Sequence, residues 1–154
     1  MARTPVHTVR TNDTAETERV GVVLGERIAR GACLCLTGPL GAGKTVLVRG
    51  LCRGLGARDA VTSPTFILME AFAGRLPIVH IDLYRLEHER EVEDIGVFDM
   101  IDGETVVIAE WGERSPALLE AADIEIVIDP GEGSSRTLHI HATPEFARVL
   151  GDLK

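Results

Sequence analysis

Gly38-Pro39-Leu40-Gly41-Ala42-Gly43-Lys44-Thr45 is the stretch that decides how this chain folds. Its letters fit G-x-x-x-x-G-K-[ST], the pattern of a phosphate-binding loop. Glycines allow backbone conformations that are closed to other residues, so successive N–H groups can turn inward around an anion. We expect Lys44 to contact the β- and γ-phosphates of a nucleotide and the Thr45 hydroxyl to bind Mg²⁺, at the positive end of a helix that begins at Gly43 or Lys44.

The residues on either side of this loop support the same interpretation. Residues 33–37 form a short apolar run typical of a buried strand, and residues 45–52 carry apolar side chains at helical spacing. The order is therefore strand, loop and helix, which is the context in which a phosphate-binding loop occurs. An incidental glycine turn would not require these flanks.

Length and composition limit the remaining possibilities. The 154 residues, 45% of them hydrophobic, suit one domain over residues 1–154 with a core sheet and covering helices. A net charge of −8 argues against unaided binding of nucleic acid. The three cysteines suit small buried side chains better than disulfides or a zinc site, which is typical of a reducing compartment. Since no apolar stretch approaches membrane-spanning length, we expect a cytoplasmic protein with no membrane partner.

The rest of the chain alternates strand-like and helix-like segments. Asp13 and Glu16 are placed like a capping box, at the start of a helix that Gly31 can end, and the acidic run over residues 86–96 is typical of a helix ending at Gly96. The sequence predicts an α/β fold of the P-loop NTPase type, with a mixed, mostly parallel sheet, helices on both faces and an antiparallel hairpin. The further strands are expected over 5–10, on both sides of 73–75, and over 105–109, 124–128 and 136–141, with a last helix near 146–150.

Two carboxylates end apolar strands. Asp82 closes the run over residues 77–82, and Glu110 closes the β-branched run over residues 105–109. Parallel strands present their carboxyl ends to the ligand crevice, so either side chain could hold the metal while the other positions water. The residues alone do not assign these two roles, and an acid at a strand end can also simply face solvent.

The segment Val61-Thr62-Ser63-Pro64-Thr65-Phe66 brings three hydroxyls together, and Pro64 holds Ser63 extended. Such a loop can reach a γ-phosphate or Mg²⁺ in nucleotide switches. It can equally be a polar connection with a rigid turn.

Together these motifs resemble the TsaE (YjeE) family of bacterial ATPases. The resemblance runs from about Asp13 to Ile140, and it is carried by the phosphate-binding loop, Ser63-Pro64-Thr65-Phe66, the run from His80 to Leu86, and Glu110-Trp111. It implies an ATPase that assists synthesis of threonylcarbamoyladenosine at position 37 of tRNA. The expected partners are TsaD and TsaB, with tRNA reached only indirectly through their complex.

The resemblance also implies roles for individual residues. By this resemblance, Thr45 and Glu110 are expected to be Mg²⁺ ligands, with Asp82 close by in the catalytic centre. The expected catalytic residues are Lys44, Asp82 and Glu110. Because Arg85 and Arg136 have no position guaranteed without a partner, we expect slow ATP hydrolysis that partners accelerate. The residues expected to contact ATP are Gly38, Gly41, Ala42, Gly43, Lys44, Thr45, Val46, Trp111 and Arg136.

Two other functions are compatible with a phosphate-binding loop in a chain of this size. A small-molecule kinase would need an acceptor pocket and an arginine-rich lid, and the sequence has no such lid segment. A nucleotide-sensing adaptor, in which hydrolysis serves only as a timer, overlaps with the role implied by the resemblance.

Overall fold

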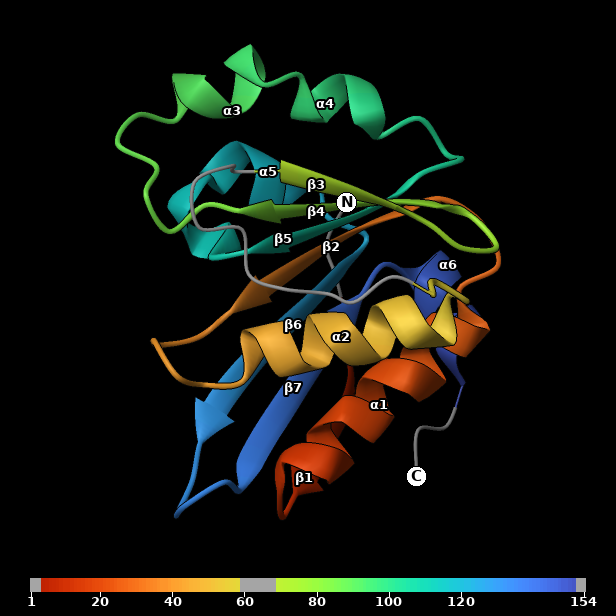
Figure 1. The fold of residues 1–154 in the computed structure, drawn as a ribbon, viewed down its shortest axis with the longest axis vertical. Coiled ribbons are helices and arrows are strands. Elements are labelled where there is room, and N and C mark those ends of the chain that lie inside the picture. Colours follow the sequence, from red (N-terminus) through yellow and green to blue (C-terminus); the bar gives the residue numbers. More distant parts are fainter. Residues whose placement is uncertain (1–3, 59–68, 152–154) are drawn as a thin grey trace.

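The computed structural model describes residues 4–58 and 69–151 (Figure 1). In this part of the chain a seven-stranded sheet has the order β1-β7-β6-β2-β5-β4-β3. The pairings of β2 with β5 and β6 and of β4 with β5 are parallel, whereas β1–β7, β6–β7 and β3–β4 are antiparallel. The mixed sheet with a parallel centre and an antiparallel hairpin is thus confirmed. The strands are β1 Thr4–Thr11, β2 Ala32–Thr37, β3 Met69–Ala73, β4 Pro77–Asp82, β5 Val106–Glu110, β6 Ile124–Pro130 and β7 Arg136–Ala142.

Helices cover both faces of this sheet (Figure 1). Side chains of β2 alternate between two apolar cores: Leu34 and Leu36 pack with α1, α2 and α6, and Cys33 and Cys35 pack with α3, α4 and α5. The predicted helices on both faces are confirmed. They are α1 Thr14–Arg27, α2 Lys44–Gly54, α3 Arg90–Asp94, α4 Val97–Met100, the 3₁₀ turn η1 Gly112–Arg114, α5 Pro116–Ala121 and α6 Pro144–Leu150.

The start of α1 follows the predicted capping chemistry with one change. Asp13 is the N-cap, and its Oδ1 accepts a hydrogen bond from the Glu16 backbone N–H at 2.8 Å. The Glu16 carboxylate accepts from the backbone N–H of Asn12, one residue before the position that a capping box uses.

Two predicted helix boundaries were wrong. The first helix ends at Arg27 and not near Gly31, whose backbone instead approaches Gly103 so closely that an added Cβ would lie 2.3 Å from the Gly103 carbonyl carbon. The acidic helix begins at Arg90 and not at Leu86, because the buried Leu83 and Leu86 hold the preceding residues in a turn against the second core. Long-range packing therefore overrides the local pattern at both places.

The predicted hydroxyl-rich segment over residues 61–66 lies outside the described residues. In the ranges that are described, none of the helices has the length and apolar character needed to span a lipid bilayer.

Candidate nucleotide site

A cavity of about 360 Å³ lies where the carboxyl ends of β4 and β5 meet the start of α2. A volume of this size is typical of small-ligand pockets. All of the predicted site residues except Gly38 line it: Gly41, Ala42, Gly43, Lys44, Thr45, Val46, Asp82, Glu110, Trp111 and Arg136.

The backbone of the loop takes the conformations that its glycines permit. Gly41 and Gly43 have φ of 79° and 101°, in the left-handed region that other residues rarely adopt. Gly38 lies behind the loop, where an added Cβ would approach the Ile128 carbonyl oxygen to 2.6 Å. Its N–H donates to Glu113 at 3.3 Å, so Gly38 shapes the turn without lining the cavity.

Lys44 is less exposed than a surface-loop charge would be, with 5% of its surface accessible. Its Nζ donates to the carbonyl oxygens of Gly38 and Pro39 and lies 3.8 Å from the centroid of the Trp111 ring. Burial lowers the pKa of Lys44, although Glu113, Glu110 and Asp82 raise it by their negative charges. The ammonium is therefore held inside the loop by neutral carbonyl acceptors. Charged phosphate oxygens are stronger acceptors and could take their place.

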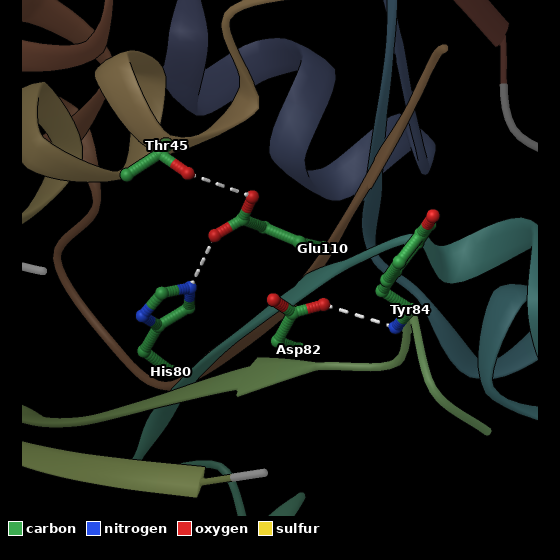
Figure 2. A network of polar contacts seen from close by, with 5 residues as sticks. All are labelled: Thr45, His80, Asp82, Tyr84 and Glu110. Carbon is green, nitrogen blue, oxygen red and sulfur yellow. Dashed lines mark hydrogen bonds and ion pairs between the residues drawn. The ribbon is translucent and has the colours of Figure 1, made fainter. Parts of the chain in front are cut away.

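Thr45, Glu110 and His80 form a short hydrogen-bonded chain (Figure 2). The Thr45 hydroxyl donates to Glu110 Oε1 at 3.1 Å, and His80 Nε2 lies 2.6 Å from Glu110 Oε2. Glu110 is 3% exposed and His80 is fully buried. Both oxygens of a nearly buried carboxylate are thus engaged by side chains from two other elements.

Asp82 reaches the same place through the register of the sheet. The parallel pairing of β4 with β5 sets Asp82 opposite Glu110, so the two carboxylates stand side by side at adjacent strand ends. Asp82 Oδ1 accepts from the Tyr84 backbone N–H at 2.9 Å (Figure 2). Burial is the main cause that raises the pKa of Asp82; the hydrogen bond from Tyr84 acts in the opposite direction.

Arg136 has a defined position, contrary to the expectation that the chain alone would not place it. Its Nε donates to the Ala42 carbonyl at 2.7 Å and its Nη2 to the Gly41 carbonyl at 3.0 Å. Further bonds run from Nη1 to the carbonyls of Gly133 and Ser135. Arg136 therefore clamps the phosphate-binding loop to the turn before β7.

Five cavity residues were not predicted from the sequence. Tyr84 stood in the motif after Asp82, and its ring lies 5.0 Å from the ring of Trp111. Thr14 and Thr17 lie in the first turns of the helix that Asp13 caps. The predicted start of that helix was the sequence signal that could have indicated them. Leu40 lies within the loop itself, and Ser134 comes close only through the β6–β7 connection, which no local pattern indicates.

The oxygen donors of the site fit Mg²⁺. A hydroxyl from Thr45 and carboxylates from Glu110 and Asp82 are hard ligands of the kind that Mg²⁺ prefers, with phosphate and water completing its shell. Two adjacent carboxylates would also repel a triphosphate unless a cation lay between them and it.

Comparison with known proteins gives a consistent result. Residues 11–138 match the family model described as "Threonylcarbamoyl adenosine biosynthesis protein TsaE". Among its relatives, a tRNA threonylcarbamoyladenosine biosynthesis protein TsaE of Nostoc sp. is 38% identical over 148 residues, covering 92% of this chain and 87% of the relative. The protein of the same name from Streptomyces coelicolor is 39% identical over 128 residues, covering 78% and 86%.

A solved structure is similar over almost the whole chain. The crystal structure of Bacillus subtilis YdiB superposes with a TM-score of 0.74 at 26% sequence identity, covering 97% of this chain and 93% of YdiB.

Proposed function

This chain belongs to the TsaE family, and from that premise we propose that it is an Mg²⁺-dependent ATPase that supports threonylcarbamoyladenosine modification of tRNA together with TsaB and TsaD. The observation that carries the proposal is the cavity in which the phosphate-binding loop, the start of α2 and the carboxylates of Asp82 and Glu110 converge. The chain would reach tRNA only through the partner proteins, because its own net charge of −8 would repel the phosphate backbone.

The chain's own groups would bind the phosphates in three ways. Backbone N–H groups of residues 43–45, which line the cavity, would contact the anion, and the amino end of α2 adds its positive dipole. Lys44 would exchange its carbonyl acceptors for β- and γ-phosphate oxygens. The Arg136 clamp would keep the loop in shape while Lys44 moves.

Thr45 and Glu110 would hold Mg²⁺, and Asp82 beside them would orient the attacking water. Bound Mg²⁺ neutralises charge that develops on the transferred phosphoryl group. Burial, which raises the pKa of Asp82, also favours its acting as a proton acceptor rather than only as a counter-charge.

The isolated chain should hydrolyse ATP slowly because, among the described residues, Lys44 and Arg136 are the cations that line the cavity. The guanidinium of Arg136 is already bound to backbone carbonyls, and Arg85 is exposed and does not line the cavity. A partner that turns an arginine into the cavity could raise turnover on the order of 10³-fold.

The test is phosphate release by the chain alone, with TsaD alone, and with TsaB and TsaD together. We expect slow release alone, acceleration with both partners, and loss of both rates in Lys44→Ala with an unchanged circular dichroism spectrum. Arg49→Ala, on the same helix but away from the cavity, is the control and should match the parent chain. Full-speed turnover unaffected by the partners, or normal turnover by Lys44→Ala, would contradict the proposal.

Arg85→Ala then locates the missing charge. If partner stimulation disappears in this variant, Arg85 is the residue that the partners reposition. If stimulation persists, the charge comes from the partner or from a rearranged Arg136.

A further inference from the structure

The buried ring of His80 contacts Glu110 but takes no part in the chemistry described so far. We propose that His80 is a positioning residue, whose Nε2–H holds the Glu110 carboxylate in the rotation that presents Oε1 to Thr45 and so forms the protein's side of the Mg²⁺ site. This inference rests on the proposed function and adds to it the residue that fixes the metal ligand.

Strand geometry places His80 where it can do this. His80 and Asp82 are two residues apart on β4, so their side chains lie on the same face of the sheet. The parallel register sets Asp82 opposite Glu110 and His80 opposite Ile108, two pairs further from the strand end. From there the imidazole reaches Glu110 Oε2 at 2.6 Å (Figure 2).

The burial of this pair requires the contact. Glu110 is 3% exposed, and a buried carboxylate is costly unless both of its oxygens accept hydrogen bonds. Thr45 engages Oε1 at 3.1 Å, and His80 engages Oε2. Without the His80 donor, Oε2 would have to turn toward water or toward Thr45, and either rotation would move Oε1 from its present place.

The other nitrogen of the ring indicates why an imidazole is present. His80 is 0% exposed. Among the described residues, its Nδ1 is the one buried side-chain nitrogen or oxygen without a hydrogen-bond partner. An apolar side chain would fill the same space without leaving a nitrogen unpaired. The ring is therefore better explained by the bond that Nε2 makes than by its packing.

The test separates the donor from the volume it occupies. His80→Met keeps a similar length and removes the donor, whereas His80→Gln keeps an N–H near the position of Nε2. His80→Asn, whose shorter amide falls short of Glu110, is a second loss variant if His80→Met folds poorly. His139→Met is the matched control, because His139 also pairs with a carboxylate, Asp129 at 2.9 Å, but does not line the cavity.

The measurement is the affinity for a fluorescent ATP analogue with EDTA and again with Mg²⁺, whose ratio reports the metal's contribution without requiring turnover. We expect His80→Met and His80→Asn to lose about 10- to 100-fold of the Mg²⁺-dependent affinity, which is the usual effect of removing a hydrogen-bond partner of a metal ligand. Their affinities in EDTA should stay within about 2-fold of the parent chain, since the loop and Lys44 are untouched. His80→Gln and His139→Met should keep most of the Mg²⁺ effect.

The outcomes distinguish this inference from the proposed function. An unchanged Mg²⁺ effect in folded His80→Met overturns the positioning role and leaves nucleotide binding standing. Equal loss in His80→Met and His80→Gln also overturns it, because the volume and not the donor would then matter. Failure of the parent chain to bind the analogue in either buffer would refute the proposed function, and the inference with it.

Discussion

Trp111 follows the last residue of β5 and has a φ of 62°. Among the described residues it is the one non-glycine residue with a positive φ. A bulky residue in this region of φ is strained and persists where the surrounding structure holds it. Here the ring packs on the second core, lies 5.0 Å from the Tyr84 ring and faces Lys44 Nζ. Trp111 therefore both packs against the core and lines the cavity.

Binding of Mg²⁺ and ATP should change the fluorescence of Trp111, the single tryptophan of the chain. Phosphate would draw Lys44 Nζ away from its place 3.8 Å above the ring, and the cation–π contact would weaken. A titration followed at the tryptophan emission maximum measures this change, with N-acetyltryptophanamide as the control for absorption by the nucleotide. A flat signal while calorimetry records binding would mean that Lys44 keeps its contact with the ring.

Cys52 provides a test of burial that does not involve the site. The residue is 1% exposed, and burial raises the pKa of its thiol from 9.0 to about 11. In the native chain we expect Cys52 to resist thiol reagents at pH 8 and to react once the chain is unfolded.

The same pKa shift predicts how stability depends on pH. Below pH 9 the thiol is protonated in both states, and above it the unfolded thiol ionises first, so the free energy of unfolding should fall by roughly 2 kcal/mol by about pH 10.5. Urea denaturation of the parent chain and of Cys52→Ala at several pH values measures this, because the difference between their slopes isolates Cys52. Parallel slopes would show that the thiol ionises equally in both states.

At the scale of elements, α1 and α2 pack unusually closely because glycines face each other across the contact. Two glycines of each helix take part, and a Cβ added to any of the four would lie 2.6 Å or less from a backbone carbonyl oxygen of the opposite helix. This close contact fixes α2, whose first turn carries Lys44 and Thr45, against the helix whose first turns line the other side of the cavity. The four residues are Gly21 and Gly25 on α1, and Gly50 and Gly54 on α2.

Substitution of Gly50 or Gly54 by alanine should destabilise the chain although alanine is the better helix former. The new Cβ would lie 2.1 Å from the Glu18 carbonyl oxygen or 2.2 Å from that of Val22, so the helices must move apart. We expect a net loss of about 1–3 kcal/mol, against an intrinsic gain of about 1 kcal/mol for the helix. Thermal denaturation measures it, and Glu26→Ala on the exposed face of α1 is the control. Equal or higher stability of both glycine variants would show that the interface can widen without cost.

At the scale of the whole molecule, the site exists because three parallel strands end together. β2 leads into the phosphate-binding loop, β5 ends at Glu110 and β4 ends at Asp82, all at the carboxyl ends of the parallel strands. α1 and the β6–β7 connection complete the cavity from the other side. A ligand here would contact most layers of the fold and should therefore stabilise the molecule as a unit.

Mg²⁺ with a slowly hydrolysed ATP analogue should raise the melting temperature by about 5–10 °C at a concentration 100 times the dissociation constant. Binding at that excess adds about 2.7 kcal/mol to the native state, and each kcal/mol is worth about 2–4 °C in a chain of this size. Differential scanning fluorimetry measures the shift, and EDTA should reduce it. Lys44→Ala should melt near the parent temperature without nucleotide and show no shift with it; a full shift in this variant would place the nucleotide elsewhere.

The local patterns of the sequence were sufficient for the fold class and for most of the cavity. Glycine spacing in residues 38–45, an apolar run before them and helical spacing after them act over a few residues, and all three are present in the structure. Both carboxylate-bearing strands were also predicted, because an apolar run that stops at an acid is visible in one dimension. The segment over residues 61–66 and the roles of the site residues stay predictions.

Only the tertiary structure decided which of these pieces meet. Register and strand order place Asp82 opposite Glu110 and bring buried His80 against the Glu110 carboxylate, and neither depends on a nearby residue in the chain. The clamp of Arg136 on the carbonyls of Gly41 and Ala42 joins segments more than ninety positions apart. Local sequence patterns determine secondary structure because backbone preferences and side-chain periodicity are local, whereas burial and hydrogen-bond partners arise only when distant strands pair.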